Sequence, residues 1–179
     1  SADAAAIVRA IIKLYKIKNS KLIINNLSKI GSDVPACFLS KNVKVSGTGE
    51  ILQPIKLLNK KLWALLIKPK SNYSTKSIFE NFNNSYANTT KFELTLNNLI
   101  NDMNKYNNSL EKTVCRIEKN VKKVLSYLYN FNSLTLPRIT GSGSTVFVLF
   151  KTKEDLKIYK KKLSFGEKDY WIQYSHLIL

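Results

Sequence analysis

Apolar positions recur along the chain with two different spacings, one helical and one strand-like. Helical spacing predicts helices over residues 1–15, 21–30, 35–39, 74–82, 94–106, 109–130 and 153–163. Strand-like runs predict strands over 42–55, 62–68, 145–150 and 170–177, the first of them divided by a glycine turn at 47–49. The polar segment 83–90 is typical of a mobile loop. The sequence contains no internal repeat.

The order of these elements predicts the architecture. Strands and helices alternate over 62–177, as in an α+β sandwich with helices on one face of an antiparallel sheet. The strand-like pattern before it ends at Pro54, so we place a domain boundary near Leu58 and expect domains over 1–57 and 58–179. The predicted inward-facing apolar positions of the helices are Leu22, Ile23, Leu27, Ile30, Val114, Ile117, Val121, Val124, Leu125 and Leu128.

Length and composition limit the class of protein. A chain of 179 residues with 44% hydrophobic content can bury one sizeable core or two small ones. Its longest apolar runs are strand-length, well short of a membrane span, and its first residues do not resemble a secretion signal. Cys37 and Cys115 suit neither a disulfide framework nor a metal site. We therefore predict a cytoplasmic protein with reduced cysteines, no structural metal and no membrane partner.

The net charge of +17 raises the question of a nucleic-acid partner. Among 29 basic residues, however, only Arg9, Arg116 and Arg138 are arginine, the residue that contacts bases and phosphates bidentately. The lysine excess accompanies abundant Asn and Ile, as in a gene of AT-rich composition. We interpret the charge as compositional drift rather than a nucleic-acid surface, and phosphorylated substrates are compatible with either interpretation.

Four segments carry candidate chemistry, and each also has a purely structural interpretation. The small residues of 1–6 open a helix whose free N–H groups could bind phosphate. Asp33, in the turn 31–35, could be a general base, a magnesium ligand or an N-cap. The Gly-x-Gly turns at 46–50 and 140–144 fit neither the dinucleotide fingerprint nor a P-loop, but the second could line a phosphate site. His176 and the lysine run 160–162 are interpreted as structural and solvated, respectively.

The order of these motifs along the chain is more specific than any one of them. Ser-Ala-Asp-Ala-Ala-Ala, Gly-Ser-Asp-Val-Pro, Gly-Thr-Gly-Glu, a Ser-Thr pair followed by Phe79, and Arg-Ile-Thr-Gly-Ser-Gly-Ser succeed one another over essentially the whole chain. This series resembles the 4-diphosphocytidyl-2-C-methyl-D-erythritol kinase family of the GHMP kinase superfamily.

The resemblance implies a fold, an activity and a set of site residues. The fold would be the two-lobe GHMP kinase fold, with a partial ribosomal-S5-domain-2-like ATP-binding lobe over 1–57 and a ferredoxin-like α/β-sandwich lobe over 58–179. The activity would be ATP- and Mg2+-dependent phosphorylation of the 2-hydroxyl of the cytidyl substrate, in isoprenoid-precursor synthesis. The implied roles are catalytic base for Asp33; ATP phosphate binding for Ser1, Ala2 and Asp3; substrate binding for Thr75 and Phe79; and a closing glycine-rich loop for Gly141, Ser142, Gly143 and Ser144.

The sequence departs from the family pattern at its beginning. The family's amino-terminal segment, with a catalytic lysine and the glycines of the nucleotide loop, has no counterpart here. We therefore expect this polypeptide alone to be inactive or marginally folded, with Ile7, Ile11 and Ile12 exposed, as a fragment or the product of a split or decayed gene. The alternatives are another GHMP kinase, acting on a sugar, homoserine or a mevalonate-type alcohol, and a non-catalytic remnant or basic binding module.

Overall fold

The structure, a computed structural model, describes residues 1–18, 20–55, 61–70, 73–83, 96–166 and 168–178. The chain divides into two compact units, Ser1–Leu57 and Leu58–Leu179. The predicted mobile loop at 83–90 lies outside the described residues except for Asn83. Within the described ranges, no helix has both the length and the apolar character needed to cross a membrane.

The described residues of the first unit pack four helical segments and a hairpin around a small core. Its buried apolar side chains are Ala5, Leu27 and Val34. Its elements are α1 (Ala2–Leu14), α2 (Ser20–Asn26), the 3-10 helix η1 (Leu27–Lys29), α3 (Val34–Leu39), β1 (Val43–Ser46) and β2 (Ile51–Pro54). The strands pair antiparallel as predicted, from Val43 opposite Pro54 to Ser46 opposite Ile51.

The predicted helix over 21–30 is wrong in its second half. The α-helix stops at Asn26, and η1 winds more tightly over the next residues. Only Leu27 of the predicted inward stripe is fully buried, whereas Leu22 and Ile30 are exposed. In α1 the exposed Ile7 and Ile11 agree with the prediction, whereas Ile12 is half-buried, and the side chain buried against the core is Ala5.

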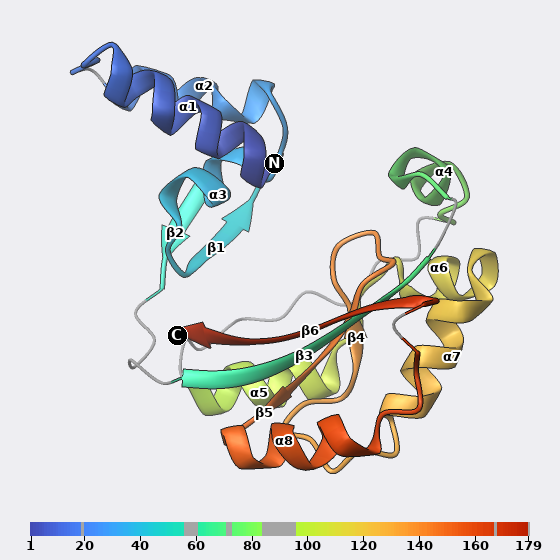
Figure 1. Ribbon diagram of the computed structural model, residues 1–179. Helices are drawn as coiled ribbons and strands as arrows, with labels where there is room; N and C mark the ends of the chain where they lie inside the picture. Colours follow the sequence, from blue (N-terminus) through green and yellow to red (C-terminus); the bar gives the residue numbers. More distant parts are fainter. Residues whose placement is uncertain (19, 56–60, 71–72, 84–95, 167, 179) are drawn as a thin grey trace. The chain divides into compact units, whose positions relative to one another are not determined.

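The second unit is built on one four-stranded antiparallel sheet in the order β4-β5-β3-β6 (Figure 1). Its elements are β3 (Lys61–Pro69), α4 (Thr75–Glu80), α5 (Leu96–Lys105), α6 (Glu111–Ile117), α7 (Lys119–Leu128), β4 (Arg138–Ile139), β5 (Val146–Phe150), α8 (Lys153–Lys162) and β6 (Tyr170–Ile178). Numbered by their order within the unit, the strands lie 2-3-1-4, which is the ferredoxin-like arrangement.

Side chains of the central strand β3 are buried on both faces of this sheet. Leu65 and Ile67 pack in the large core with α4, α6, α7 and α8, whereas Leu62 and Ala64 belong to a second cluster with α5. The prediction that the helices cover one face is therefore wrong for α5. Burial on both faces explains the nearly unbroken apolar run of β3.

The single helix predicted over 109–130 is two helices. Glu118 interrupts it with extended backbone (φ −119°, ψ 95°), and its side chain accepts a hydrogen bond from the Asn120 N–H at 3.0 Å, which caps α7. The apolar spacing runs through this break, so the pattern alone concealed it. Ile117, predicted to face inward, ends α6 and is 37% exposed.

Candidate functional site

Asp33 lies at the mouth of α3 with its carboxylate free of the capping role. The residue occupies the N-cap position, but its side chain makes no capping hydrogen bond. The turn is held instead by the backbone, with the Val34 N–H donating to the Gly31 carbonyl at 3.0 Å, and by the buried side chains of Val34 and Pro35. The sequence left three roles open for Asp33: general base, magnesium ligand and N-cap. Its side chain does not fill the N-cap role. The carboxylate is exposed on a short, anchored turn.

The β1–β2 turn packs directly behind this carboxylate-bearing turn. Gly49 has φ +102°, and a Cβ built on it would lie 1.8 Å from the Ser32 carbonyl oxygen. Only glycine fits such an approach. The turn is itself fixed by Glu50, whose carboxylate accepts hydrogen bonds from the Thr48 N–H (2.7 Å) and Oγ1 (2.8 Å). The Gly-Thr-Gly-Glu motif therefore supports the Gly-Ser-Asp-Val-Pro motif, a contact that the sequence did not reveal.

The hydrogen bond from the Thr48 hydroxyl, together with backbone N–H groups, lowers the pKa of Glu50. Its carboxylate is therefore ionised at neutral pH and serves the turn. Asp33 is exposed and has no such engagement at its helix. The carboxylate of Glu50 thus holds its own turn, whereas that of Asp33 makes no capping hydrogen bond.

The beginning of α1 lies beside the beginning of α3. Ala5, in the first turns of α1, is buried in the same cluster as Val34, the residue after Asp33. The Ala5 N–H donates to the Ser1 carbonyl at 3.0 Å, and the Ser1 side chain makes no capping bond. Ser1, Ala2 and Asp3 are exposed at this helix end. The first unit thus brings the candidate phosphate-binding residues and the candidate base to one side of its core.

Arg9 joins the same two helices at the other end of α3. Its Nη1 donates to the carbonyls of Cys37 (3.1 Å) and Phe38 (2.9 Å) and to Ser40 Oγ (2.9 Å). These carbonyls lie in the last turn of a six-residue helix, where no further turn supplies N–H partners, and the Cys37 carbonyl also accepts a hydrogen bond from Ser40 Oγ at 3.0 Å. Sequence reasoning missed this role, although the rarity of arginine in a lysine-rich chain is a signal that could have drawn attention to it.

In the second unit, the glycine-rich loop is held from several sides. The Tyr73 hydroxyl donates to the Ser142 carbonyl (3.2 Å), and Asn108 Nδ2 donates to the Gly141 carbonyl (2.8 Å). A Cβ on Gly143, which has φ +76°, would lie 2.5 Å from the Tyr73 hydroxyl. Burial raises the pKa of Tyr73, while a hydrogen bond with Ser144 acts in the opposite direction. Tyr73 therefore stays a neutral phenol, and it and Asn108 are loop-positioning residues that sequence reasoning missed.

Thr75 meets the glycine-rich loop at its polar edge. Thr75 Oγ1 and Ser142 Oγ lie 3.0 Å apart, within hydrogen-bonding distance. Phe79 lies one turn further along α4, on the same side of the helix, and is 58% exposed. Thr75, which the resemblance assigns to substrate binding, thus contacts Ser142 of the glycine-rich loop, and the exposed Phe79 ring lies on the same side of α4 as Thr75.

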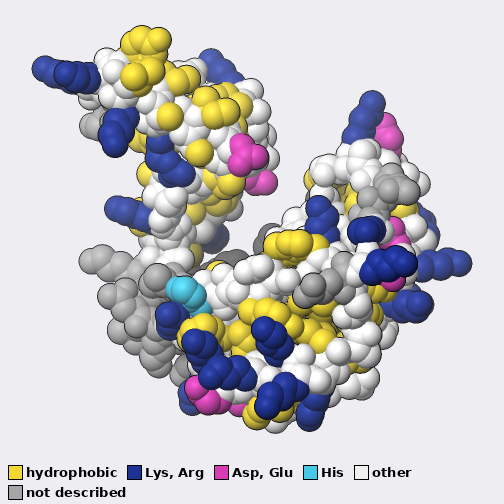
Figure 2. Space-filling model, viewed as in Figure 1, with side chains coloured by type: hydrophobic (Ala, Val, Ile, Leu, Met, Phe, Trp, Pro, Cys, Tyr) yellow, Lys and Arg dark blue, Asp and Glu magenta, His cyan; other side chains and the backbone are white. Residues whose placement is uncertain are grey.

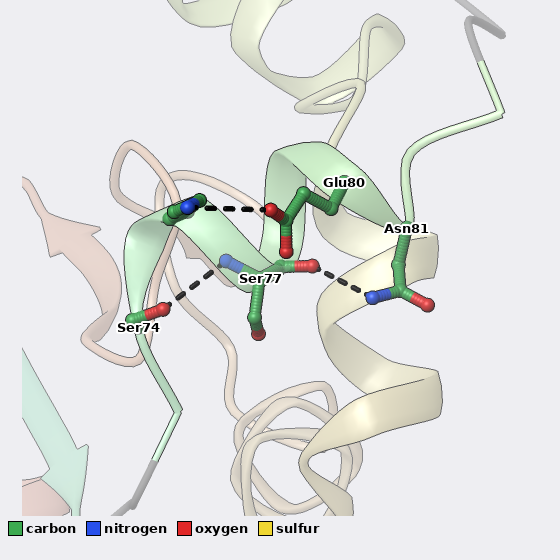
Figure 3. A network of polar contacts seen from close by, with 5 residues as sticks. Ser74, Ser77, Glu80 and Asn81 are labelled. Carbon is green, nitrogen blue, oxygen red and sulfur yellow. Dashed lines mark hydrogen bonds and ion pairs between the residues drawn. The ribbon is translucent and has the colours of Figure 1, made fainter.

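The helix that carries Thr75 and Phe79 is held at both ends (Figure 3). At its start, Ser74 Oγ accepts a hydrogen bond from the Ser77 N–H at 3.1 Å. At its end, Asn81 Nδ2 donates to the Ser77 carbonyl at 2.8 Å. Arg116 from α6 also donates to the Asn81 carbonyl, at 2.9 Å. A six-residue helix is unstable alone, so these contacts fix the position of Thr75 and Phe79.

The third arginine acts in the same way. Arg138 Nε donates to the carbonyl of Tyr106, the residue after α5, at 3.3 Å. All three arginines of the chain therefore bind carbonyls at the ends of helices. The predicted site residues fall in two groups: Ser1, Ala2, Asp3 and Asp33 in the first unit, and Thr75, Phe79, Gly141, Ser142, Gly143 and Ser144 in the second.

The chain resembles known proteins both in sequence and in fold. No family model matches the chain. It is 29% identical over all of its length to the 4-diphosphocytidyl-2-C-methyl-D-erythritol kinase of Wolbachia pipientis wMel, and covers 62% of that protein. It is 32% identical to the enzyme of the same name from Chromobacterium violaceum (89% of this chain, 55% of that protein). With that from Buchnera aphidicola it shares 35% identity (86% and 50%).

Two solved structures match the fold. A crystal structure of 4-(cytidine 5'-diphospho)-2C-methyl-D-erythritol kinase superposes with TM-score 0.74 and 23% identity, over 96% of this chain and 63% of that one. A homoserine kinase from Cytophaga hutchinsonii gives TM-score 0.59 and 15% identity, over 98% and 65%. The chain therefore has the fold of the GHMP-type small-molecule kinases.

Within that class, the resemblance to the 4-diphosphocytidyl-2-C-methyl-D-erythritol kinases is confirmed, and these kinases are homologues of the chain over its whole length. The chain spans about three-fifths of the length of the curated relatives that it matches first.

Proposed function

We propose that this chain forms part of an ATP-dependent kinase that phosphorylates the 2-hydroxyl of 4-diphosphocytidyl-2-C-methyl-D-erythritol. The names of its homologues supply the substrate and the reaction class. The observation that carries the proposal is the state of Asp33, an exposed carboxylate at the predicted catalytic position that is not used as a helix cap. The turn around it is built so closely against Gly49 that its position is strongly constrained.

In the proposed reaction, Asp33 accepts the proton of the substrate hydroxyl. The hydroxyl oxygen forms a bond to the γ-phosphorus of ATP, the bond from that phosphorus to the β–γ bridging oxygen breaks, and ADP leaves. The free N–H groups at the start of α1, beside Ser1, Ala2 and Asp3, would bind phosphate oxygens. The chain's task is thus to aim one carboxylate and to hold the phosphates.

The second unit would bind the rest of the substrate. The hydroxyls of Thr75 and Ser142 suit polar groups, and the exposed ring of Phe79 suits stacking against cytosine. The residues of the glycine-rich loop, Gly141, Ser142, Gly143 and Ser144, would close over the reacting groups. Tyr73 and Asn108 would keep this loop in its binding conformation.

The implied Mg2+ fits this donor set only as a metal held mainly by phosphate oxygens. Among the described residues, no three His, Cys, Asp or Glu side chains cluster as a metal site. Magnesium in such enzymes needs one or two carboxylates besides the phosphates and water, and Asp3, in the first turn of α1, is the candidate. When bound it would neutralise phosphate charge. The two free cysteines suit the reducing cytoplasm, where we place the reaction.

The test uses the protein expressed from its whole reading frame, called the full-length protein below. It is supplied with ATP, Mg2+ and the cytidyl substrate, and ADP release and the new phosphate monoester are followed by 31P NMR. Turnover with this substrate, and none with homoserine, is the expected result. Turnover with homoserine instead would support a kinase of the superfamily but contradict the proposed cytidyl substrate. The absence of turnover with either substrate would favour the alternative of a non-catalytic remnant.

A further inference from the structure

A small cavity of about 270 Å³ lies between α8 and the strands β3 and β6 of the second unit. Aromatic rings form its strand side, with Trp63 and Tyr174 prominent and His176 at a ring-centroid distance of 5.6 Å from Trp63. No residue of the glycine-rich loop or of α4 is among the described residues that line it. The cavity is therefore separate from the groups assigned above to substrate binding.

Lysines form the other side of the cavity. Lys153, Lys157 and Lys160 line it from α8, at positions i, i+4 and i+7, which share one face of the helix. Figure 2 shows basic side chains gathered with apolar surface over this part of the molecule. Among the described residues that line the cavity, none is acidic.

The ammonium groups are drawn over the aromatic rings. Lys153 Nζ lies 5.3 Å from the centroid of the Trp63 ring, and Lys160 Nζ lies 4.6 Å from that of Tyr174. A further ammonium group, that of Lys61 on β3, lies 4.9 Å from the Trp63 ring. The first turn of α8 carries two acids, Glu154 and Asp155; neither lines the cavity, and Asp155 is engaged with the capping Thr152. Like charges at this spacing repel one another, and cation–π contacts offset only part of that cost.

These features define the chemistry of a ligand. An apolar, aromatic floor favours a flat apolar group, and the volume admits only a small one. Three lysines along one side of the cavity match a phosphate monoester, with a charge of about −1.5 to −2, better than a singly charged carboxylate. Lysine ammonium groups bind phosphate as point charges. We propose that this cavity, hereafter the α8 pocket, binds a small organophosphate with a flat apolar or aromatic body.

Tryptophan fluorescence gives a local readout of such binding. The chain has two tryptophans, Trp63 in the α8 pocket and Trp171 on β6. Trp171→Phe in the full-length protein removes the second emitter of this chain. Titration with 1-naphthyl phosphate should then change the emission of Trp63 in a saturable manner. Inorganic phosphate and 1-naphthalenemethanol, which is uncharged, should each bind much more weakly. The first lacks the aromatic body, and the second lacks the phosphate group.

Paired variants on one helix test the role of the lysines. Lys153→Gln/Lys157→Gln removes two charges from the α8 pocket and should weaken binding about tenfold, as expected for two solvent-accessible charge pairs. Lys161→Gln/Lys162→Gln removes the same net charge outside the lining and should leave affinity within about twofold. Asp33→Asn should leave binding unchanged, so the result does not depend on the proposed kinase activity.

Four outcomes would overturn the assignment. One is the absence of a saturable change in Trp63 emission, and another is equal weakening by the two double variants. The third is equal binding of 1-naphthalenemethanol and 1-naphthyl phosphate, which would leave an apolar cavity without a phosphate site. Competition by added ATP at the affinity of the kinase site would likewise show that the probe reports that site instead.

Discussion

Two helices of equal length, α3 and α4, differ in how they begin. Both have six residues, and both have an arginine of a neighbouring helix bound to carbonyls at their C-terminal ends. Ser74 caps α4 with its side chain, whereas Asp33, one of the best N-cap residue types, does not cap α3. A helix that leaves such a side chain unused must be held by other contacts. In α3 these are Gly49 at its start and Arg9 at its end.

The largest effect is expected from Gly49→Ala. The new Cβ would overlap the Ser32 carbonyl, and φ +102° is itself strained for alanine, so the first unit should lose about 3 kcal/mol or more. Hydrogen exchange of the amides in 27–55 of the full-length protein measures this loss. Gly166→Ala, where a Cβ meets nothing within 4 Å, is the matched control. Equal protection in both variants would contradict the support that we assign to Gly49.

Arginine removal should affect α3 more than α4. Arg9 donates to three acceptors and Arg116 to one, so Arg9→Met should cost about 1–2 kcal/mol and Arg116→Met about 0.5–1 kcal/mol. Lysine at either position should restore only part of the loss, because it lacks the planar fork of donors. Local hydrogen exchange in each helix gives both values. Full rescue by lysine would show that charge alone is sufficient.

Alanine substitution at the two N-cap positions should have different effects on helix stability. Ser74→Ala removes a hydrogen bond to the Ser77 N–H and should destabilise α4 by about 1 kcal/mol. Asp33→Ala removes no capping bond and should leave the stability of α3 within about 0.5 kcal/mol. Exchange rates of the first amides of each helix report the difference. A comparable loss at Asp33 would mean that its carboxylate caps the helix in solution.

The smallest effect concerns pH. Burial raises the pKa of Glu111, although the hydrogen bond from the Ile139 N–H and the charge of Arg138 oppose the shift. A carboxyl with a raised folded pKa stabilises the fold most below its unfolded pKa, and this contribution is lost as the pH rises through the folded value. Glu111→Gln should therefore gain stability relative to the parent between pH 4 and 7, measured by urea unfolding with tryptophan fluorescence. If Glu111→Gln instead lost stability relative to the parent over that pH interval, the raised pKa of Glu111 would be contradicted.

Much of the fold could be predicted because local patterns specify it. The strands other than β4, the β1–β2 turn and the short helices after Asp33 and Ser74 follow from apolar spacing, glycine turns and caps. The two-residue strand β4 (Arg138–Ile139) was not predicted, because it is too short to give an apolar pattern of its own. The break at Glu118 could not be predicted, because the apolar stripe continues through it and only the backbone angles show the change of direction. The position of α5 on the second face of the sheet depends on packing between distant segments.

The candidate site could likewise be predicted only in part. The sequence order of motifs indicated Asp33, Thr75 and the glycine-rich loop. The contacts that hold them, from Gly49 to Ser32 and from Tyr73 to Ser142, join residues far apart in sequence or in different turns. Spacing carries no information about such contacts. The arginines are an intermediate case, since their scarcity in the sequence was visible but their carbonyl partners were not.

In the proposed reaction, the carboxylate of Asp33, left free by its helix, removes the proton of the substrate hydroxyl. The direct measurement is kcat for the Asp33→Asn variant of the full-length protein, with ATP and the cytidyl substrate saturating. The variant keeps the shape of the side chain and should lose about 10²–10⁴-fold in kcat, while the KM for ATP changes little. A kcat close to that of the parent would contradict the account.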